Sequence, residues 1–354
     1  MRNSPAAQVA VLGIDIGKNT FHAVGLDRRG AIVLRQKWTR GQLGNRLANL
    51  PPCLIGMEAC AGAHHLARQC AALGHEARLM PAKYVKPYGK GQKNDFRDAE
   101  AIAEAVQRPT MRFVAIKTTE QLDLQALHRI RQQLVAQRTR LITQIRAFLL
   151  ERGIAVRQGP RHLRTELPII LATRSDALSP RMLRMIEDLA QDWRGLDTRI
   201  DDVTAEIAAL ARQDAGAERL MSVPGIGPII SSAMVAAIGA GEVFTKGRDF
   251  AAWLGLVPKQ ISTGDRTVLG PISRRGNRYL RALFVQAAWV VLIKPQSWAR
   301  HGFAAWIEAA KKRLHRNVLA VALANKLARI AWAVLARGRG FEAHSTRDAS
   351  PQPV

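Results

Sequence analysis

Apolar and polar residues alternate along the start of the chain in three short runs. These runs lie at 8–16 (QVAVLGIDI), 21–27 (FHAVGLD) and 31–38 (AIVLRQKW). A period of two is typical of strands that bury one face. Because the links at 17–19 and 28–30 have turn sequences, the pattern predicts two hairpins and three antiparallel strands.

The pattern then changes between helix and strand. Helices are expected at 41–50, 62–74 and 95–107, and strands at 53–59 and 75–80. The resulting order, β-β-β-α-β-α-β-α, resembles that of ribonuclease H-like (RuvC-like) domains. The resemblance implies the strand order 3-2-1-4-5 and an α/β first domain over residues 1–117.

Long amphipathic helices are predicted over residues 118–215. One helix is expected at about 118–151, a link with Gly, Pro and Arg at 153–164, and a second helix at 181–213. In the second helix, apolar residues step alternately by three and four from Ile186 to Leu210. Such a narrow stripe is typical of coiled coils and needs a partner helix. The partner is either the preceding long helix or a second subunit.

A mostly helical domain is predicted at 216–337, with helices near 247–254, 276–293, 297–313 and 316–337. It begins with a Pro-Gly-x-Gly turn between apolar helical segments, at 221–239. This segment resembles a helix-hairpin-helix, in which turn amides, here those of Gly225 and Gly227, contact a phosphate. The tail at 338–354 is expected to be disordered.

The chain is strongly basic. Its 354 residues include 53 Lys and Arg against 28 Asp and Glu, a formal net charge of +25. Most of the excess is Arg, which binds phosphate in planar bidentate contacts. Nucleic acid is therefore the expected partner.

Other features concern the compartment. The three cysteines, Cys53, Cys60 and Cys70, show no metal-ligand spacing and are expected to be reduced thiols. The N-terminus runs directly into a strand, and the apolar stretch at 283–293 is too short to span a bilayer. We expect a cytoplasmic protein with no membrane partner.

One carboxylate, Asp15, lies within an apolar strand, where an unpaired charge is costly. The expected fold brings Glu58 beside it, and Asp95 and Asp98 share a face of the following helix. Converging carboxylates repel one another unless cations neutralise them, and oxygen ligands suit Mg²⁺. Two ions ~3.5–4 Å apart could then support phosphodiester cleavage. Taken singly, the helical aspartates could cap a helix and Glu58 could pair with an Arg.

Four motifs are specific enough for comparison with known families. They are GIDIGK at 13–18, GMEACAGAHHLA at 56–67, KNDFRDAEAIAEA at 93–105 and the stretch at 250–288. Together they resemble insertion-sequence transposases of the DEDD type. That family includes the Piv DNA invertase and recombinases guided by a structured bridge RNA. The resemblance covers about residues 9–335.

The resemblance implies roles for particular residues. The DEDD tetrad falls on Asp15, Glu58, Asp95 and Asp98, which would hold the metal. The family's Ser-Ser/Thr-Gly motif falls on 262–264, so Ser262 would attack DNA and form a phosphoserine link, with Ser273 as the alternative. Nearby arginines are expected to contact phosphates: Arg266, Arg274, Arg275, Arg278 and Arg281.

These expectations combine into a Mg²⁺-dependent transposase that cuts and rejoins DNA and needs no nucleotide cofactor. Its expected partners are donor and target DNA, a guide RNA and further copies of the chain, as a dimer or tetramer, in the bacterial nucleoid. The acids and the serine could come from one chain or from two.

Other functions remain open. One is a RuvC-like junction-resolving nuclease, in which water attacks and no covalent link forms. Another is a basic nucleic-acid-binding scaffold without activity. The start of the chain, GIDIGKNT, also resembles the first phosphate loop of sugar-kinase and actin-like ATPases. Those proteins need a second phosphate loop and a Gly-rich adenosine site, which we do not find in the sequence.

Overall fold

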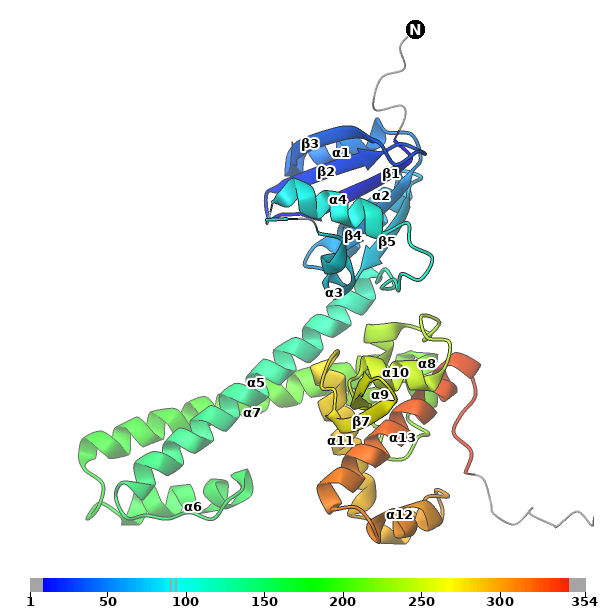
Figure 1. Ribbon diagram of the computed structural model, residues 1–354. Coiled ribbons are helices and arrows are strands. Elements are labelled where there is room, and N and C mark those ends of the chain that lie inside the picture. Colours follow the sequence, from blue (N-terminus) through cyan, green and yellow to red (C-terminus); the bar gives the residue numbers. More distant parts are fainter. Residues whose placement is uncertain (1–8, 90, 93, 344–354) are drawn as a thin grey trace, which may run out of the picture. The chain divides into compact units, whose positions relative to one another are not determined.

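The computed structural model describes residues 9–89, 91–92 and 94–343. The chain divides into two compact units, Met1–Thr119 and Glu120–Val354 (Figure 1), and each is considered by itself. The first predicted domain lies within the first unit. The boundary predicted after residue 215 falls inside the second unit and stays a prediction.

A five-stranded mixed sheet forms the centre of the first unit. Its strands are β1 (Val11–Ile16), β2 (Thr20–Leu26), β3 (Ile32–Thr39), β4 (Leu54–Glu58) and β5 (Glu76–Met80). The order is β3-β2-β1-β4-β5, with β1 antiparallel to β2 and parallel to β4. Both predicted hairpins and the predicted strand order are therefore confirmed.

Helices cover both faces of this sheet. Helices α1 (Arg40–Ala48) and α2 (Ala63–Ala72) pack over one face, where Leu12 and Ile14 of β1 are buried. Helix α4 (Asp95–Ala105) packs over the other face, as Figure 1 shows. Two short elements, α3 (Ala82–Val85) and η2 (Lys86–Tyr88), were not predicted from the sequence.

Two glycines let α4 approach the sheet unusually closely. A β-carbon built on Gly13 of β1 would lie 2.1 Å from the carbonyl oxygen of Ala99 and 2.5 Å from the amide nitrogen of Ala103. On Gly56 of β4 it would lie 2.8 Å from Cβ of Val106. Real side chains do not tolerate such distances, so only glycine fits where the helix crosses these strands.

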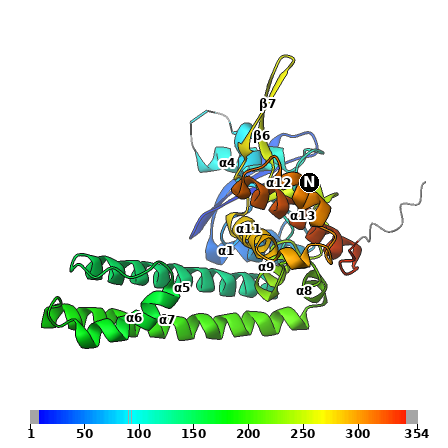
Figure 2. The same cartoon turned by 90° about the horizontal axis from the view of Figure 1, so that it is seen from below.

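In the second unit, two long helices lie side by side (Figures 1 and 2). They are α5 (Thr119–Leu150) and α7 (Pro180–Gln213). Arg131 bonds to Thr204 and Arg138 to Asp197, so the two helices are antiparallel. Of the two partners considered for the apolar stripe, a helix of the same chain is therefore present.

The apolar stripe on α7 consists of two rows of side chains, and the two rows differ in burial. One row is fully buried: Ile186, Trp193, Ile200 and Ile207. The other row is half-buried or exposed: Leu189, Leu196, Val203 and Leu210. Packing within the chain therefore covers one of the two rows completely.

The link predicted at 153–164 is partly wrong, because helix α6 (Pro160–Thr173) begins inside it. Pro160 occupies the first turn of α6, where a missing N–H costs nothing and a fixed φ suits the helix. Arg164 of α6 joins Arg138 of α5 on the carboxylate of Asp197, at 2.5 and 3.0 Å. Pro160 therefore starts a helix, and Arg164 holds that helix to α7 through Asp197.

The rest of the second unit is mostly helical, as predicted. Its helices are α8 (Ala215–Leu220), α9 (Pro228–Ile238), α10 (Gly247–Trp253), α11 (Arg278–Leu292), η3 (Pro295–Ser297), α12 (Ala304–Lys311) and α13 (Arg316–Arg337). The helix expected from residue 297 begins only at Ala304, after a short turn of 3-10 helix. A hairpin of β6 (Pro258–Thr263) and β7 (Arg266–Ile272) was not predicted.

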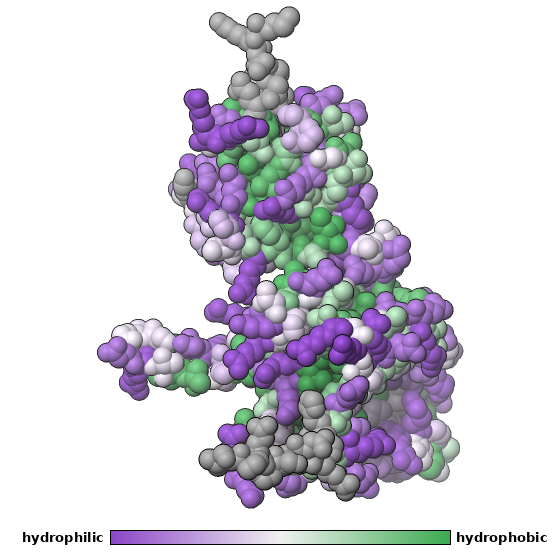
Figure 3. Space-filling model, turned by 90° about the vertical axis from the view of Figure 1, so that its right-hand side faces the viewer, coloured by the Kyte–Doolittle hydropathy of each residue, from purple (hydrophilic) through white to green (hydrophobic). Residues whose placement is uncertain are grey.

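Within the described residues, α13 is the one helix that is long and apolar enough to cross a membrane. Half of its most apolar window is buried, and Leu323, Ala324 and Leu327 lie in the core of the second unit. This burial is that of a core helix. On the face drawn in Figure 3, hydrophilic side chains cover much of the surface, with apolar patches between them.

A buried polar network connects α5 with α9 and α11. His128 is 3% exposed, and its two ring nitrogens lie 3.1 Å from Ser232 Oγ and 3.1 Å from the Tyr279 hydroxyl. Because Ser232 donates its hydroxyl proton to Pro228 O, His128 Nε2 must be the donor to Ser232. Burial, aided by Arg131, lowers the pKa of His128 from 6.5 to about 4. The imidazole is therefore neutral at pH 7.

Replacing Gly13 by Ala should displace α4 from the sheet. We expect the first unit to lose ~1–3 kcal/mol of stability, as in other overpacked cores. Faster amide hydrogen exchange in β1 and α4 than in wild type would report this loss of stability. The control is Gly44→Ala in α1, where an added β-carbon meets nothing within 4 Å. Equal exchange in the two variants would contradict the close helix–sheet contact.

Replacing His128 by Leu should destabilise the second unit at pH 7 by ~1–3 kcal/mol, because Tyr279 loses its buried partner. In the unfolded state His128 takes up a proton near pH 6.5, whereas in the folded state it does so only near pH 4. Wild type therefore loses stability as the pH falls through this range, and the variant does not. The stability gap between wild type and variant should therefore narrow from pH 7 to pH 5, by urea unfolding. A gap that stays constant would contradict the neutral imidazole.

Candidate active site and nucleic-acid interface

Two carboxylates lie at adjacent strand ends in the first unit. Asp15 is the fifth residue of β1, and Glu58 is the last residue of β4, which runs parallel to β1 with Ile14 opposite Met57. Side chains two apart on a strand share a face. Since Gly13 and Gly56 face α4, Asp15 and Glu58 lie on that same face, as the sequence predicts.

The other two carboxylates lie in the first turn of α4. Asn94 caps this helix by accepting a hydrogen bond from Phe96 N at 2.9 Å, which fixes where the helix begins. Asp95 is exposed and Asp98 is half-buried. Negative charge at a helix N-terminus is favoured by the helix dipole, which offsets part of the repulsion among these acids.

The carboxylates influence one another electrostatically. Burial raises the pKa of Glu58 above its usual range, and the charges of Asp15 and Asp98 raise it further. Three of the four predicted acids therefore share one local field. The fourth, Asp95, has its Oδ2 3.6 Å from Nδ1 of His22.

His22 is a member of the site that we did not predict. It pairs across the sheet with Asp15, is 9% exposed, and packs edge-on against Phe96 of α4 with ring centroids 4.8 Å apart. The signal was present in the sequence. A tight turn at 17–19 places the residue at 22 opposite the one at 15, so a histidine beside the acid could have been foreseen.

The donor set is chemically suited to a hard divalent cation. It consists of carboxylate oxygens, and the pKa of Glu58 is raised first by burial and then by the charges of Asp15 and Asp98, which a cation would neutralise. In the described part of the chain, however, no three His, Cys, Asp or Glu side chains lie close enough together to hold one ion as they stand. An ion would have to draw Asp15, Glu58 and the helical aspartates together.

Ser262, the predicted nucleophile, lies in the second unit on the exposed strand β6. Its Oγ lies 3.0 Å from Thr267 Oγ1 on β7 and accepts a hydrogen bond of 2.9 Å from Gln260 Nε2. Gly264, with a φ of +54°, forms the two-residue hairpin turn with Asp265. The signal for this hairpin was the Gly-Asp pair, with Ile261 and Thr263 before it and Thr267 and Val268 after it.

The alternative serine, Ser273, lies just after β7. Its amide donates to Val257 O at 2.7 Å, and its Oγ accepts from the amide of Arg275 at 3.4 Å. The backbone here is tightly held, because a β-carbon on Gly276 would lie 1.8 Å from Trp253 O. Arg274 has a φ of +54°, a strained value for a residue with a side chain.

Three predicted phosphate-binding arginines form one electrostatic cluster. Burial, followed by the charges of Arg278 and Arg274, lowers the pKa of Arg281. One of the guanidinium N–H groups of Arg281 donates to Leu254 O at 2.8 Å, so part of its bonding is structural. Arg266 and Arg275 are exposed, Arg266 beside the hairpin turn.

The two glycines of the predicted helix-hairpin-helix differ. Gly225 has a φ of +81°, and a β-carbon there would lie 2.6 Å from Ala287 O of α11. Gly225 is therefore needed for packing in the turn between α8 and α9. Gly227 caps α9 and has open space at its β-carbon position. A phosphate contact at either glycine stays a prediction.

Comparison with known proteins identifies families for both units. Residues 12–153 match a transposase family of the DEDD IS110 type, and residues 217–303 match the family described as Transposase IS116/IS110/IS902. The first match contains all four carboxylates. A DEDD-type domain indicates dependence on a divalent metal. The second match contains both candidate serines and the arginines around them.

Several curated proteins are similar over nearly the whole chain. A probable family 20 transposase of Pseudomonas aeruginosa is 43% identical over 92% of this chain and 96% of its own. The transposase for insertion sequence element IS1328 of Yersinia enterocolitica is 41% identical, with 94% and 98% covered. That for IS1111A of Coxiella burnetii is 38% identical, with 95% and 92% covered. The chain belongs to the IS116/IS110/IS902 family of transposases, enzymes that cut and rejoin DNA.

Proposed function

We propose that this transposase breaks and rejoins DNA strands by Mg²⁺-dependent transesterification through a phosphoserine intermediate. The observation that carries the proposal is geometric: Asp15 and Glu58 share one face at the ends of adjacent parallel strands, and Asp98 lies in the first turn of the helix that packs on that face. Acids placed so that they repel one another are typical of a site that binds cations. Asp15, Glu58, Asp95 and Asp98 would hold the metal, with two ions per site.

The proposed reaction begins at Ser262. Its Oγ forms a bond to phosphorus and loses its proton to solvent, while the P–O bond to the departing DNA hydroxyl breaks and that oxygen takes up a proton. A hydroxyl of a second strand then reverses the step, so joining needs no nucleotide. When bound, Mg²⁺ would neutralise charge on the phosphate oxygens.

Side chains around Ser262 would prepare it for attack. Gln260 donates to its Oγ, and Thr267 Oγ1 lies 3.0 Å away, where either hydroxyl can be the donor, so both neighbours would hold the Ser262 hydroxyl in position. Arg266, Arg274, Arg275, Arg278 and Arg281 would hold the DNA backbone by charge-assisted hydrogen bonds. None of these contacts selects a base, so sequence would be read by pairing with a guide RNA.

The proposal extends to the partners. Donor and target DNA and a structured guide RNA would bind homo-oligomers of the chain in the bacterial nucleoid. The half-exposed row of α7 (Leu189, Leu196, Val203 and Leu210) is a surface that a second copy could cover. The acids and the serine would act on one phosphodiester, supplied by one chain or by two.

A junction-resolving nuclease is the second candidate. The observation that favours it is that all four carboxylates lie in the first unit, whose strand order is the one expected of ribonuclease H-like domains. In that reaction water would attack, and no serine would be needed. A covalent protein–DNA link separates the two reactions.

The serine experiment uses end-labelled element DNA incubated with the full chain and Mg²⁺, and then resolved on a denaturing gel. Wild type should give a labelled protein–DNA species, and Ser262→Ala should abolish it with DNA binding kept. Ser273→Ala is the matched control and should retain the species. If the labelled species is lost in Ser273→Ala but kept in Ser262→Ala, Ser273 is the nucleophile. Cleavage without any covalent species would favour the nuclease.

The metal experiment uses Glu58→Gln, which keeps shape and removes charge. We expect strand cleavage to fall by at least ~100-fold, because metal positioning depends on the carboxylate. A second readout is thermal unfolding with and without Mg²⁺. Wild type should be stabilised by the ion and the variant should not.

Asp188→Asn, on the exposed surface of α7, is the matched control for this charge removal. It should keep both the cleavage and the Mg²⁺-dependent stabilisation. An ion that stabilises Glu58→Gln as strongly as wild type would refute the assignment of Glu58 as a ligand.

A further inference from the structure

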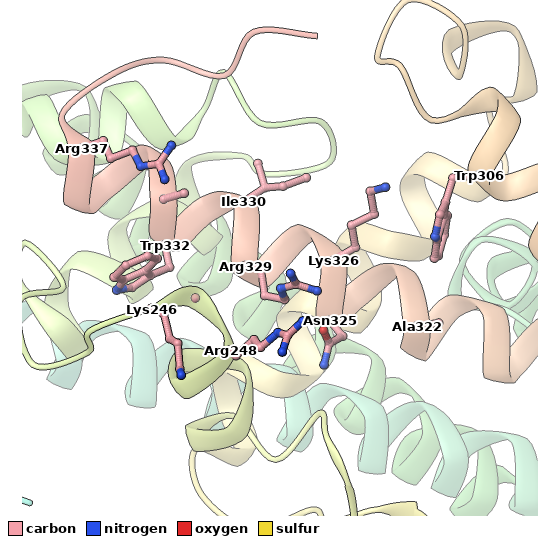
Figure 4. Close-up of a pocket in the computed structure, with 12 residues that line it drawn as sticks. Lys246, Arg248, Trp306, Ala322, Asn325, Lys326, Arg329, Ile330, Trp332 and Arg337 are labelled. Atoms are coloured by element: carbon pink, nitrogen blue, oxygen red, sulfur yellow. The ribbon is translucent and has the colours of Figure 1, made fainter. Parts of the chain in front are cut away.

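A basic groove lies in the second unit. None of the residues that line it belongs to the hairpin of β6 and β7. The groove runs along α13, with the start of α10 on one side and Trp306 of α12 at one end (Figure 4). Its volume is about 640 Å³. Five cationic side chains line it: Lys246, Arg248, Lys326, Arg329 and Arg337.

The cations are held together by packing. A β-carbon on Gly247 would lie 3.0 Å from Arg329 O, so the start of α10 rests directly on α13. That contact brings Arg248 close to Arg329, and their guanidinium groups lie next to one another in Figure 4. Burial, with a further contribution from Arg329, lowers the pKa of Lys326.

No carboxylate balances this charge. Within the described ranges, none of the five cations forms an ion pair, and no Asp or Glu lines the groove. Like charges this close repel one another, and a bound polyanion would relieve the repulsion. Five cations spread along a groove suit a chain of phosphates better than a single small anion.

Aromatic rings complete the lining. Lys326 Nζ lies 4.9 Å from the ring centroid of Trp306. Trp332 is fixed by a hydrogen bond of 3.1 Å from its Nε1 to Gly241 O. Positive charge interleaved with aromatic rings is typical of surfaces that bind unpaired nucleotides, whose exposed bases stack on rings. A duplex would offer phosphates and leave the rings unused.

Asn325 adds an acceptor oxygen to a groove whose other polar side chains are donors. Its Nδ2 donates to Leu256 O at 3.1 Å, and in Figure 4 its oxygen lies on the side of the two guanidinium groups. A 2′-hydroxyl can donate to such an oxygen, and this group distinguishes RNA from DNA.

We propose that this groove binds an unpaired strand of RNA, with Arg248 and Arg329 on consecutive phosphates and Asn325 on a ribose. The inference rests on the RNA partner of the proposed function, and not on its phosphoserine chemistry. None of the groove residues is among those assigned above to the DNA backbone.

The test uses the full chain and three labelled probes: a 12-nucleotide oligouridine, the same oligomer in deoxyuridine, and a 12-base-pair DNA duplex. Fluorescence anisotropy at several salt concentrations gives each affinity. In Arg248→Gln/Arg329→Gln, oligouridine binding should weaken about tenfold, and its log–log salt slope should fall by about 1.4, for two phosphate contacts. Duplex affinity should change less than twofold.

The matched control is Arg181→Gln/Arg184→Gln, which removes the same charge from the exposed surface of α7. It should leave oligouridine affinity within twofold of wild type. The proposed binding site would be refuted if both double variants lost oligouridine affinity equally. It would also be refuted if Arg248→Gln/Arg329→Gln lost affinity equally for oligouridine and for the duplex. Equal losses for oligouridine and deoxyuridine would overturn the assignment to RNA.

A cross-linking measurement needs no variant. Photocross-linking of 4-thiouridine RNA to wild type should map to the peptides that contain Trp306 and α13, and its absence there would overturn the proposal. Ser262→Ala should bind oligouridine as wild type does. Loss of the covalent DNA species in that variant therefore tests the strand chemistry separately from the groove.

Discussion

The site in the first unit depends on the contact between α4 and the backbone of β1 and β4. At Gly13 and Gly56 the helix lies so close that even a methyl group would overlap with Ala99, Ala103 or Val106. The contact sets the height of α4 above the sheet. The acids lie two residues beyond these glycines and in the first turn of the helix, so a small displacement there would separate them.

This rigidity has an electrostatic consequence. Carboxylates on flexible loops would move apart to reduce repulsion, whereas those on β1, β4 and the capped start of α4 cannot. Burial raises the pKa of Glu58, and the charges of Asp15 and Asp98, which cannot move away, raise it further. The chain as a whole carries a formal net charge of +25. Long-range attraction by the basic surface would bring a phosphate backbone near, and local repulsion would require a cation to accompany it.

Sequence alone predicted the features that depend on local pattern. The five strands follow from alternation and short turns, and the structure contains them. Their order was implied by the resemblance to ribonuclease H-like domains, and the four acids were assigned as a set by the resemblance to DEDD transposases. His22 was missed because its role depends on cross-strand register, although the turn length contained that information. The hairpin around Ser262 was missed because nearly all of its residues are exposed, so no apolar alternation marks it. The basic groove depends on α10 and α13 meeting, which no local pattern encodes.

The exposed hairpin also constrains how the proposed nucleophile works. All six residues of β6 are exposed, including the apolar Ile261, and within the part of the chain that the structure describes β6 pairs with β7 alone. An isolated two-stranded hairpin is marginally stable in water. Its geometry would become fixed only when DNA or another chain covers it. If Ser262 is the nucleophile, as proposed, it would attack only after the complex has assembled, and premature strand cleavage would be suppressed without a separate inhibitory element.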